Sequence, residues 1–304
     1  MAPKGGRLTL GHLGTFDSLN PFIIKGVAAV GIREFVYESL LARSLDEPFT
    51  LYGQIAESVD VTQDRSAAEF LLRPQARFSD GTPITPDDVV FSWSLLKERG
   101  QPFHRSYYRN VAFARVTGPH SVKFEFVGHN REMPLIMGLM PILPRHRVAS
   151  ETFEHTGFEP PVGSGPYVVG GVDAGRRVVL LKNPDWWARD LPITRGRFNF
   201  DEIRTDYFRD ATSLFEAFKS GTVDFREEDS PERWATAYDF PATEDHRVVR
   251  REFSIGTPAG MNAFAFNTRR QAFSDERVRR ALLRLFDIEW INRNRFPGHY
   301  SRTC

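Results

Sequence analysis

Cysteine is almost absent from this chain: one residue of 304 is a cysteine, and this residue, Cys304, stands last. An intramolecular disulfide and a zinc site built on cysteine are therefore excluded. An excess of one charge is lacking too, because 40 Lys and Arg balance 39 Asp and Glu and leave a net charge of +1. Residues 267–304 hold nine arginines against four acids, but they lack a recognisable nucleic-acid-binding motif. We therefore expect no nucleic-acid partner.

Long hydrophobic runs are missing as well. The longest nearly apolar stretch, Pro134 to Pro144, carries three prolines and falls well short of the roughly 20 residues that a membrane-spanning helix needs. We expect the chain not to be embedded in a membrane. Its first residues, Met-Ala-Pro-Lys-Gly-Gly, lack the apolar core of an export signal, so no signal peptide is expected within this chain.

Signatures of catalysis are also scarce. The stretch around Ser164, Gly-Ser-Gly, is similar to a nucleophile elbow, but Val162 stands where that motif needs glycine. Neither Gly-x4-Gly-Lys-Ser/Thr nor Gly-x-Gly-x-x-Gly occurs, and the eight histidines include no i, i+4 pair. The sequence thus predicts no catalytic residue, no metal site and no cofactor, and hence no enzyme. A hydrolase that uses a pair of cleft carboxylates stays a distant alternative.

The clearest element is a helix that begins after Thr85. Thr85 is an N-cap candidate, Pro86 takes the first helical position, and Asp88 completes a capping box. Val89, Trp93 and Leu96 form one apolar stripe, and Gly100 marks the end. Apolar spacing also predicts helices over 28–42, from Asp210 to Gly221, and over 274–287 with Ser274 as cap. Strands are predicted at 7–11, 69–73, 121–127, 176–182 (with both faces covered), 223–225, 247–253 and 261–266. These interleaved elements indicate an α/β or α+β protein.

Aromatic residues are well represented, at 13% of the chain. Phe103, Tyr107 and Tyr108 follow the capped helix in a polar, loop-like stretch, and Trp186 and Trp187 follow a strand. Aromatic side chains on loops often contact ligands, although a place in the core is equally open for the two tryptophans. Because catalytic signatures are absent, these residues favour a binding function.

Five segments, read in order, resemble the solute-binding proteins of bacterial peptide ABC importers, family 5. They are DSLNP (17–21), FSDGTPITPDDVVFSW (78–93), GSGPY with NPDWW (163–167 and 183–187), AFKSGTVD (217–224) and FNTRR with FSDERVRRA (266–270 and 273–281). PFHRSYY (102–108) and YDFP (238–241) are most similar to the YejA-type branch. The resemblance spans nearly the whole chain.

The resemblance implies an α/β periplasmic binding protein-like fold of the class II, or cluster C, type. Residues 1–50 and 165–260 would form a discontinuous first-lobe domain, and residues 51–164 an inserted subdomain. Residues 261–304 would begin a truncated second lobe, so that the chain is an N-terminal portion of a longer protein.

The resemblance also nominates ligand-binding residues. Lys25, Gly26 and Val27 align where the family's first lobe offers backbone to an extended peptide. Tyr107 and Tyr108 fall near a pocket aromatic of the family, and Met261 and Asn262 precede a strand that lines the cleft. Lys25 replaces an acidic residue that some oligopeptide binders carry.

The function implied is that of a periplasmic binding component that captures oligopeptides or peptide-like compounds. Its expected partners are an ABC permease and ATPase subunits. A second interpretation keeps the fold but changes the ligand to an oligosaccharide or an opine, stacked on Trp186, Trp187, Tyr107 or Tyr108.

Overall fold

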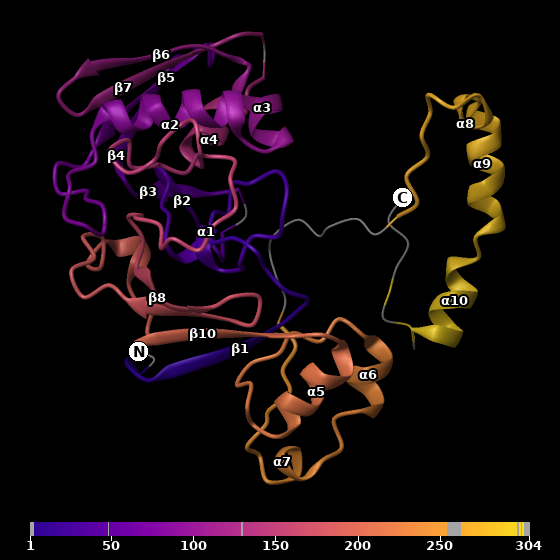
Figure 1. Cartoon of the computed structure of the whole chain (residues 1–304). Helices are drawn as coiled ribbons and strands as arrows, with labels where there is room; N and C mark the ends of the chain where they lie inside the picture. The colour runs from indigo at the N-terminus through magenta and orange to yellow at the C-terminus, as the bar shows by residue number, and fades with distance from the viewer. Residues whose placement is uncertain are drawn as a thin grey trace. The chain divides into compact units, whose positions relative to one another are not determined.

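The computed structural model describes residues 3–47, 49–128, 130–253, 263–296, 298 and 300. The chain divides into two compact units, Met1–Phe225 and Arg226–Cys304, and Figure 1 shows the elements of each. Helices and strands are interleaved along the first unit, as the sequence predicts. No helix of the described ranges is long and apolar enough to cross a membrane.

One four-stranded sheet of the first unit joins the two ends of that unit. Its strands follow the order β1-β10-β9-β8, with β1 parallel to β10 and the other pairs antiparallel. Their bounds are Arg7–Leu13 (β1), Tyr167–Asp173 (β8), Arg177–Lys182 (β9) and Glu202–Phe208 (β10). Helix α5, Ala211–Lys219, begins after Asp210, as predicted, and the Asp210 side chain caps it. It packs on β1 closely enough that a Cβ at Gly11 would lie 2.1 Å from Leu214 Cδ1, so any side chain at this position would have to displace Leu214.

A second four-stranded sheet is antiparallel throughout and has the order β4-β5-β7-β6. The strands are Ala56–Val61 (β4), Ala67–Leu72 (β5), Val111–Gly118 (β6) and Ser121–Phe126 (β7). Helix α2, Pro86–Arg99, packs on β6 and β7 (Figure 1). Its capping box between Thr85 and Asp88 is formed as predicted. Val89 and Leu96, two residues of the helix, are buried.

Shorter elements complete the first unit. They are α1 (Ile32–Phe35), β2 (Leu41–Arg43), β3 (Leu51–Gly53), α3 (Pro102–Tyr108), α4 (Met133–Gly138) and the 3-10 turn η1 (Pro192–Thr194). One continuous hydrophobic cluster links both sheets, since it contains Phe70 and Phe124 of one and Val178 and Ile203 of the other. The lobe boundaries predicted at residues 50, 164 and 260 stay a prediction.

Three expectations for the first unit are wrong. No strand forms at 223–225, where Phe225 makes only an isolated parallel bridge to Leu10. The helix predicted over 28–42 is limited to α1, because the chain turns into β2 at Leu41. Strand β9 was expected to be covered on both faces, but its burial alternates: Val178 and Leu180 are buried, whereas Leu181 is 41% exposed. Antiparallel sheets commonly leave one face to solvent.

The second unit is mainly helical. Its helices are α6 (Pro231–Thr236), α7 (Pro241–Glu244), α8 (Gln271–Ser274), α9 (Glu276–Leu285) and α10 (Ile288–Arg295). Asp275 rather than Ser274 caps α9. The strand predicted at 247–253 is wrong, because its described residues adopt no strand. The strand predicted at 261–266 begins outside the described residues, and none forms at 263–266.

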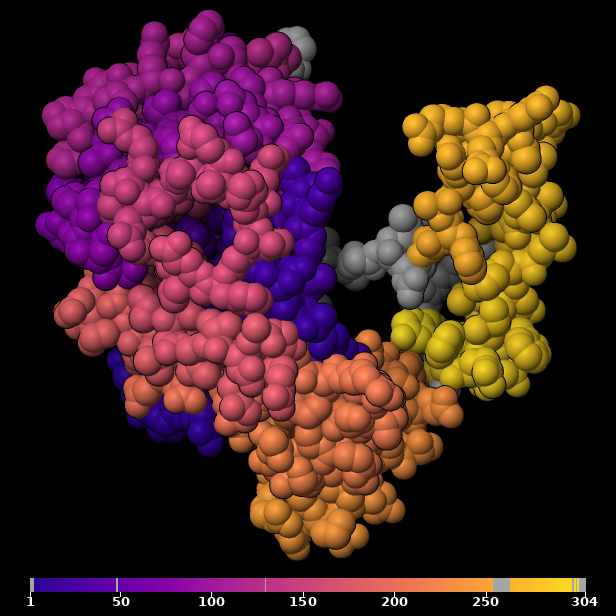
Figure 2. Space-filling model, in the orientation of Figure 1, coloured from indigo at the N-terminus to yellow at the C-terminus, as the bar shows by residue number. Residues whose placement is uncertain are grey.

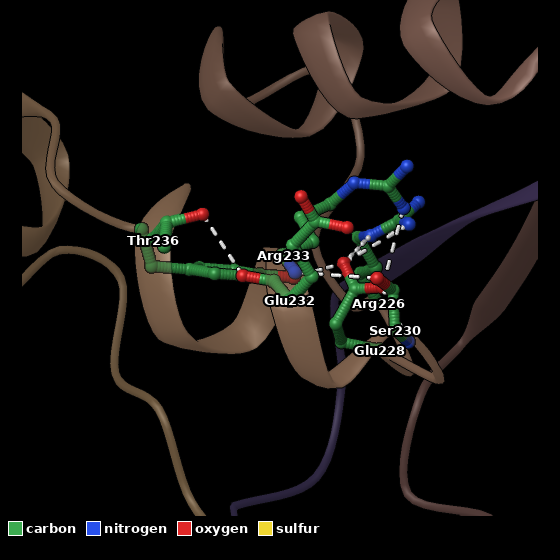
Figure 3. A network of polar contacts seen from close by, with 7 residues as sticks. Arg226, Glu228, Ser230, Glu232, Arg233 and Thr236 are labelled. Atoms are coloured by element: carbon green, nitrogen blue, oxygen red, sulfur yellow. Dashed lines mark hydrogen bonds and ion pairs between the residues drawn. The ribbon is translucent and has the colours of Figure 1, made fainter. Parts of the chain in front are cut away.

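A buried carboxylate organises the start of the second unit (Figure 3). The side chain of Glu228 is 1% exposed and forms ion pairs of 3.2 Å with both Arg226 and Arg233. Its Oε1 also accepts the backbone N–H of Ser230, at 3.1 Å, and its Oε2 the hydroxyl of Tyr238, at 3.0 Å. Burial alone would raise the pKa of Glu228, but these hydrogen bonds and charges outweigh burial and lower it.

Candidate ligand-binding site

The predicted ligand segment Lys25–Val27 lies in a loop of the first unit that is closed on itself. Asp17 donates its N–H to the carbonyl of Val27, at 2.9 Å, and accepts the Val27 N–H on its carboxylate, at 2.7 Å. The next pair along, Ser18 and Ala28, forms an isolated parallel bridge. The N–H and the carbonyl of Val27 are thus both hydrogen-bonded within the loop, and its side chain is exposed to solvent.

Gly26 allows this closure. Its φ is +105°, and a Cβ there would lie 2.7 Å from Asp17 Oδ1, so another residue would strain the turn and displace the carboxylate. Lys25 and Gly26 are exposed. The structure records no hydrogen bond from the N–H of either residue to the described residues. The described part of the fold therefore does not use these two N–H groups.

Side chains from distant parts of the sequence hold the loop in place. Gln101, just before α3, donates its amide to the carbonyls of Pro21 and Ile23, at 3.3 and 3.2 Å. Asn20 Nδ2 donates to the carbonyl of Phe153, at 2.6 Å. These contacts give a physical reason for the polar residues of DSLNP. The sequence signal was the motif itself for Asp17 and Asn20, whereas nothing local indicated Gln101.

A cavity of about 420 Å³ opens beside this loop. Asn20, Phe22 and Tyr37 line one part of it, and residues 143–162 supply the remainder, including Arg147 and His155. Figure 2 shows the surface hollowed beneath the pink arch that this segment forms. The lining mixes aromatic rings with hydrogen-bonding groups, which is typical of small-molecule sites.

The two predicted pocket tyrosines have different surroundings. The polar stretch that carries them is not a loop but helix α3, so consecutive side chains point in different directions. Tyr107 is 46% exposed, whereas Tyr108 is 4% exposed and belongs to the hydrophobic core. The structure therefore leaves the Tyr107 ring free to stack on a ligand, whereas the Tyr108 ring is packed in the core.

The two tryptophans are structural. Trp186 is 5% exposed, and its indole N–H lies 3.1 Å from both Glu38 Oε1 and the carbonyl of Ser164. Trp187 is partly buried, and its N–H donates to Glu38 Oε2, at 2.9 Å. Gln54 adds a third donor to this carboxylate. Desolvation raises the pKa of Glu38 to about 8, against the opposing effect of these hydrogen bonds.

Two predicted site residues and the possibility of a metal site remain to be considered. Met261 and Asn262 lie outside the described residues. Among the residues that the structure describes, no three His, Cys, Asp or Glu side chains are grouped so as to hold a metal ion. His155 borders the cavity without any such group around it. The described part of the chain thus offers a hydrogen-bonding and aromatic site.

Comparisons with known proteins agree with this architecture. Residues 50–303 match the model of the bacterial extracellular solute-binding proteins, family 5 Middle. A Brucella suis protein named only as a binding protein is 49% identical over 312 residues, covering 99% of this chain and 51% of its own. The peptidoglycan-binding protein YepA of Agrobacterium fabrum is 44% identical over 316 residues, with the same two coverages. The chain thus spans about half the length of the curated relatives it matches.

Solved structures share the fold at low sequence identity. NikA of Brucella suis, in complex with Fe(III)-EDTA, matches with a TM-score of 0.74 and 19% identity over 98% of this chain and 58% of its own. The oligopeptide-binding protein AppA of Bacillus subtilis, in complex with a nonapeptide, matches with a TM-score of 0.66 and 23% identity over 79% of this chain and 47% of its own. The fold is therefore that of the periplasmic binding proteins, covering part of their length. The chain belongs to the bacterial extracellular solute-binding proteins of family 5.

Proposed function

We propose that this chain is part of a periplasmic binding protein that captures oligopeptides or peptide-like compounds and delivers them to an ABC permease with its ATPase subunits. The observation that carries the proposal is the loop at Lys25 and Gly26. These two consecutive residues are exposed, and their N–H groups have no recorded partner among the described residues. An extended peptide can accept such bonds on its own carbonyls whatever its side chains are.

The relatives support a ligand with a peptide part. YepA is named for binding peptidoglycan, whose stems are peptides, and AppA holds a nonapeptide on the same fold. NikA, which holds a metal chelate, shows that the fold alone does not fix the ligand. The peptide assignment therefore depends on the loop and on the relatives together.

The alternative of a stacked oligosaccharide or opine receives less support. Of the four aromatic residues considered for stacking, Trp186 and Tyr108 are buried, and Trp187 is tied to Glu38. Tyr107 alone among these four exposes close to half of its surface. One exposed ring is a poor platform for a sugar chain. We also propose that the site binds its ligand without turnover.

Native mass spectrometry of the chain tests this function. The chain is mixed with a random pentapeptide pool, a panel of oligosaccharides and an opine, and bound masses are released and identified. We expect intact peptides to be retained. Retention of sugars or opine without peptides would refute the proposal, and release of cleaved peptides would indicate a hydrolase instead.

A pair of glycine variants connects binding to the loop. Gly26→Ala places a Cβ against Asp17 and should lower peptide retention by about tenfold or more. Gly196→Ala is the matched control, because Gly196 also has a positive φ, of 78°, but has open space around its Cβ position. Equal retention by both variants would remove the loop from the binding site.

A further inference from the structure

A cation in the first unit forms no ion pair within 4.0 Å with any described residue. Arg33, on α1, is partly buried, and among the described residues its recorded hydrogen bond is a long one, 3.4 Å from Nη2 to the carbonyl of Leu139. Burial lowers the pKa of Arg33 and outweighs the charge of the neighbouring Glu34, which raises it, and Glu34 is exposed and forms no ion pair with Arg33. Withdrawing a guanidinium from water without a carboxylate is unfavourable. Such a group is well suited to receive an anion.

Two phenols lie close to this cation. Tyr37 and Tyr108 are buried, and burial raises the pKa of each phenol while the Arg33 charge opposes the rise. Both hydroxyls are therefore protonated donors at neutral pH. Neither hydroxyl has a recorded hydrogen bond to a described residue. Arg33, Tyr37 and Tyr108 thus bring a positive charge and two free O–H groups into one region.

A chain of ring contacts fixes these groups. The ring of Phe22 lies 5.2 Å from that of Tyr37 and 6.2 Å from that of His104, and His104 lies 5.5 Å from Tyr108. Burial, with a smaller effect of the Arg33 charge, lowers the pKa of His104 to about 4. His104 is therefore neutral at pH 7, and its Nδ1 is buried without a partner among the described atoms. The positive charge of this cluster is accordingly that of Arg33.

The cluster is connected to the cavity described above. Phe22 and Tyr37 belong to the ring chain and also line the cavity of about 420 Å³. A ligand in the cavity therefore contacts Tyr37, whose phenol lies within the electrostatic reach of Arg33. Arg33 and Tyr108 do not line the cavity themselves, so Tyr37 is the residue of the cluster that borders it.

We infer that Arg33, Tyr37 and Tyr108 form a binding site for a carboxylate of the ligand. The planar guanidinium can donate two parallel N–H bonds to the two oxygens of a carboxylate. The phenols can donate to the lone pairs that remain, so that the anion is fully hydrogen-bonded when it leaves water. The inference depends on the proposed function in taking the ligand to be a peptide, which can supply a carboxylate from its C-terminus or from an acidic side chain.

Three isotope-coded pentapeptide pools test this site by competitive native mass spectrometry. The first has free C-termini and no Asp or Glu, the second is the same pool with C-terminal amides, and the third is amidated but contains Asp and Glu. We expect the first or the third pool to bind at least about tenfold more tightly than the second, because a hydrogen bond to a charged group contributes free energy of that size. Which pool is preferred identifies the source of the carboxylate.

Variants assign the preference to the cluster. In Arg33→Gln the ratio of binding between the preferred pool and the second pool should fall to about one. Arg33→Lys should retain part of this preference, because the charge remains although the planar guanidinium is lost. Tyr108→Phe should weaken the preference, because it removes the hydroxyl and keeps the ring. Arg65→Gln is the matched control, because Arg65 also donates to a carbonyl, that of Arg131, but is exposed on the surface away from the cluster. Equal binding of all three pools by the wild-type chain, or an unchanged preference in Arg33→Gln, would overturn the inference while leaving peptide binding intact.

Acetate separates failure of this inference from failure of the proposed function. If no peptide pool binds, the proposed function fails, and the carboxylate site is judged by titrating acetate against chloride while the ring resonances of Tyr108 and His104 are followed by NMR. Acetate-specific shifts that disappear in Arg33→Gln would support the site. Shifts that are absent, or that persist in the variant, would refute it.

Discussion

Trp187 donates its indole N–H to Oε2 of Glu38, 2.9 Å away, across 149 positions of the sequence. Trp186 and Gln54 donate to Oε1 of the same carboxylate, and Ser164 Oγ accepts the backbone N–H of Glu38. Glu38 therefore connects GSGPY and NPDWW through one buried group. These two segments carry the family resemblance, and this contact gives them a structural reason to occur together.

The titration of Glu38 should make stability depend on pH. Desolvation raises its pKa from the ordinary value of 4.5 to about 8 in the folded chain, so the folded state binds a proton that the unfolded state has released. The stabilisation is complete below about pH 4.5 and is lost as the pH rises through about 8. Urea unfolding at successive pH values should show the free energy of unfolding falling by about 1 kcal/mol or more across this range.

Glu38→Gln is the control for this dependence. The amide has nearly the same shape but does not titrate, so the Glu38 contribution to the slope should vanish. The same slope in the variant and in the wild-type chain would show that other groups cause it.

Gly163, at the start of the GSGPY segment, should tolerate no side chain. A Cβ there would lie 1.9 Å from the carbonyl oxygen of Val36, which is backbone and cannot rotate away. Gly163→Ala should therefore lower the free energy of unfolding by about 3 kcal/mol. Gly157→Ala is the matched control, because nothing lies within 4 Å of its Cβ position, and its effect should stay within about 0.5 kcal/mol. Equal effects would refute the packing argument.

The capping box of α2 allows a similar comparison within a single helical turn. Asp88 Oδ2 accepts both the N–H and the hydroxyl of Thr85, and its Oδ1 accepts the N–H of Arg145, at 3.0 Å. Asp88→Ala should cost about 1–3 kcal/mol of unfolding free energy, because it leaves these donors without an acceptor. The side chain of the neighbouring Asp87 is largely exposed, so Asp87→Ala should change stability little. Thermal unfolding of both variants measures the difference, and equal losses would contradict it.

Local signals account for the parts of the fold that the sequence predicts well. The cap at Thr85, the helix that starts at Asp210 and the first strand depend on residues next to one another, and the structure confirms each of them. The apolar alternation of 247–253 also looks local, but a strand needs a neighbour, and none of these residues pairs in the described structure. Local pattern alone cannot tell whether a partner strand exists.

The site is harder to predict because its contacts are distant in sequence. Gln101 and Asn20 support the loop through residues 78 to 133 positions away. The sequence does not distinguish Tyr107 from Tyr108, but in helix α3 the side chain of Tyr107 is exposed and that of Tyr108 is buried. Arg33 carries no motif at all, since its significance lies in what surrounds it in three dimensions. Motifs indicated the region of the site, whereas the roles of individual side chains required the fold.

The Glu228 cluster should control the local stability of the second unit (Figure 3). Glu228→Ala removes the carboxylate that pairs with Arg226, whose side chain is 8% exposed, and with Arg233. Removing one partner of a buried ion pair typically costs about 3–5 kcal/mol. Hydrogen exchange of the amides of α6 should therefore become much faster in this variant. Exchange is the appropriate measurement, because global unfolding mainly reports on the larger first unit.

The pH dependence of this protection has the opposite sign to that of Glu38. The pKa of Glu228 is lowered in the folded chain, so its stabilisation is present above the ordinary glutamate pKa of 4.5 and is lost as the pH falls below it. Protection of α6, corrected for the intrinsic exchange rate, should accordingly decline in acid in the wild-type chain but not in Glu228→Ala. Glu227→Ala is the control, because Glu227 is exposed beside the cluster and should leave protection unchanged. If Glu227→Ala and Glu228→Ala accelerate exchange equally, the effect comes from the net charge of the segment, and the buried pairing does not stabilise this unit.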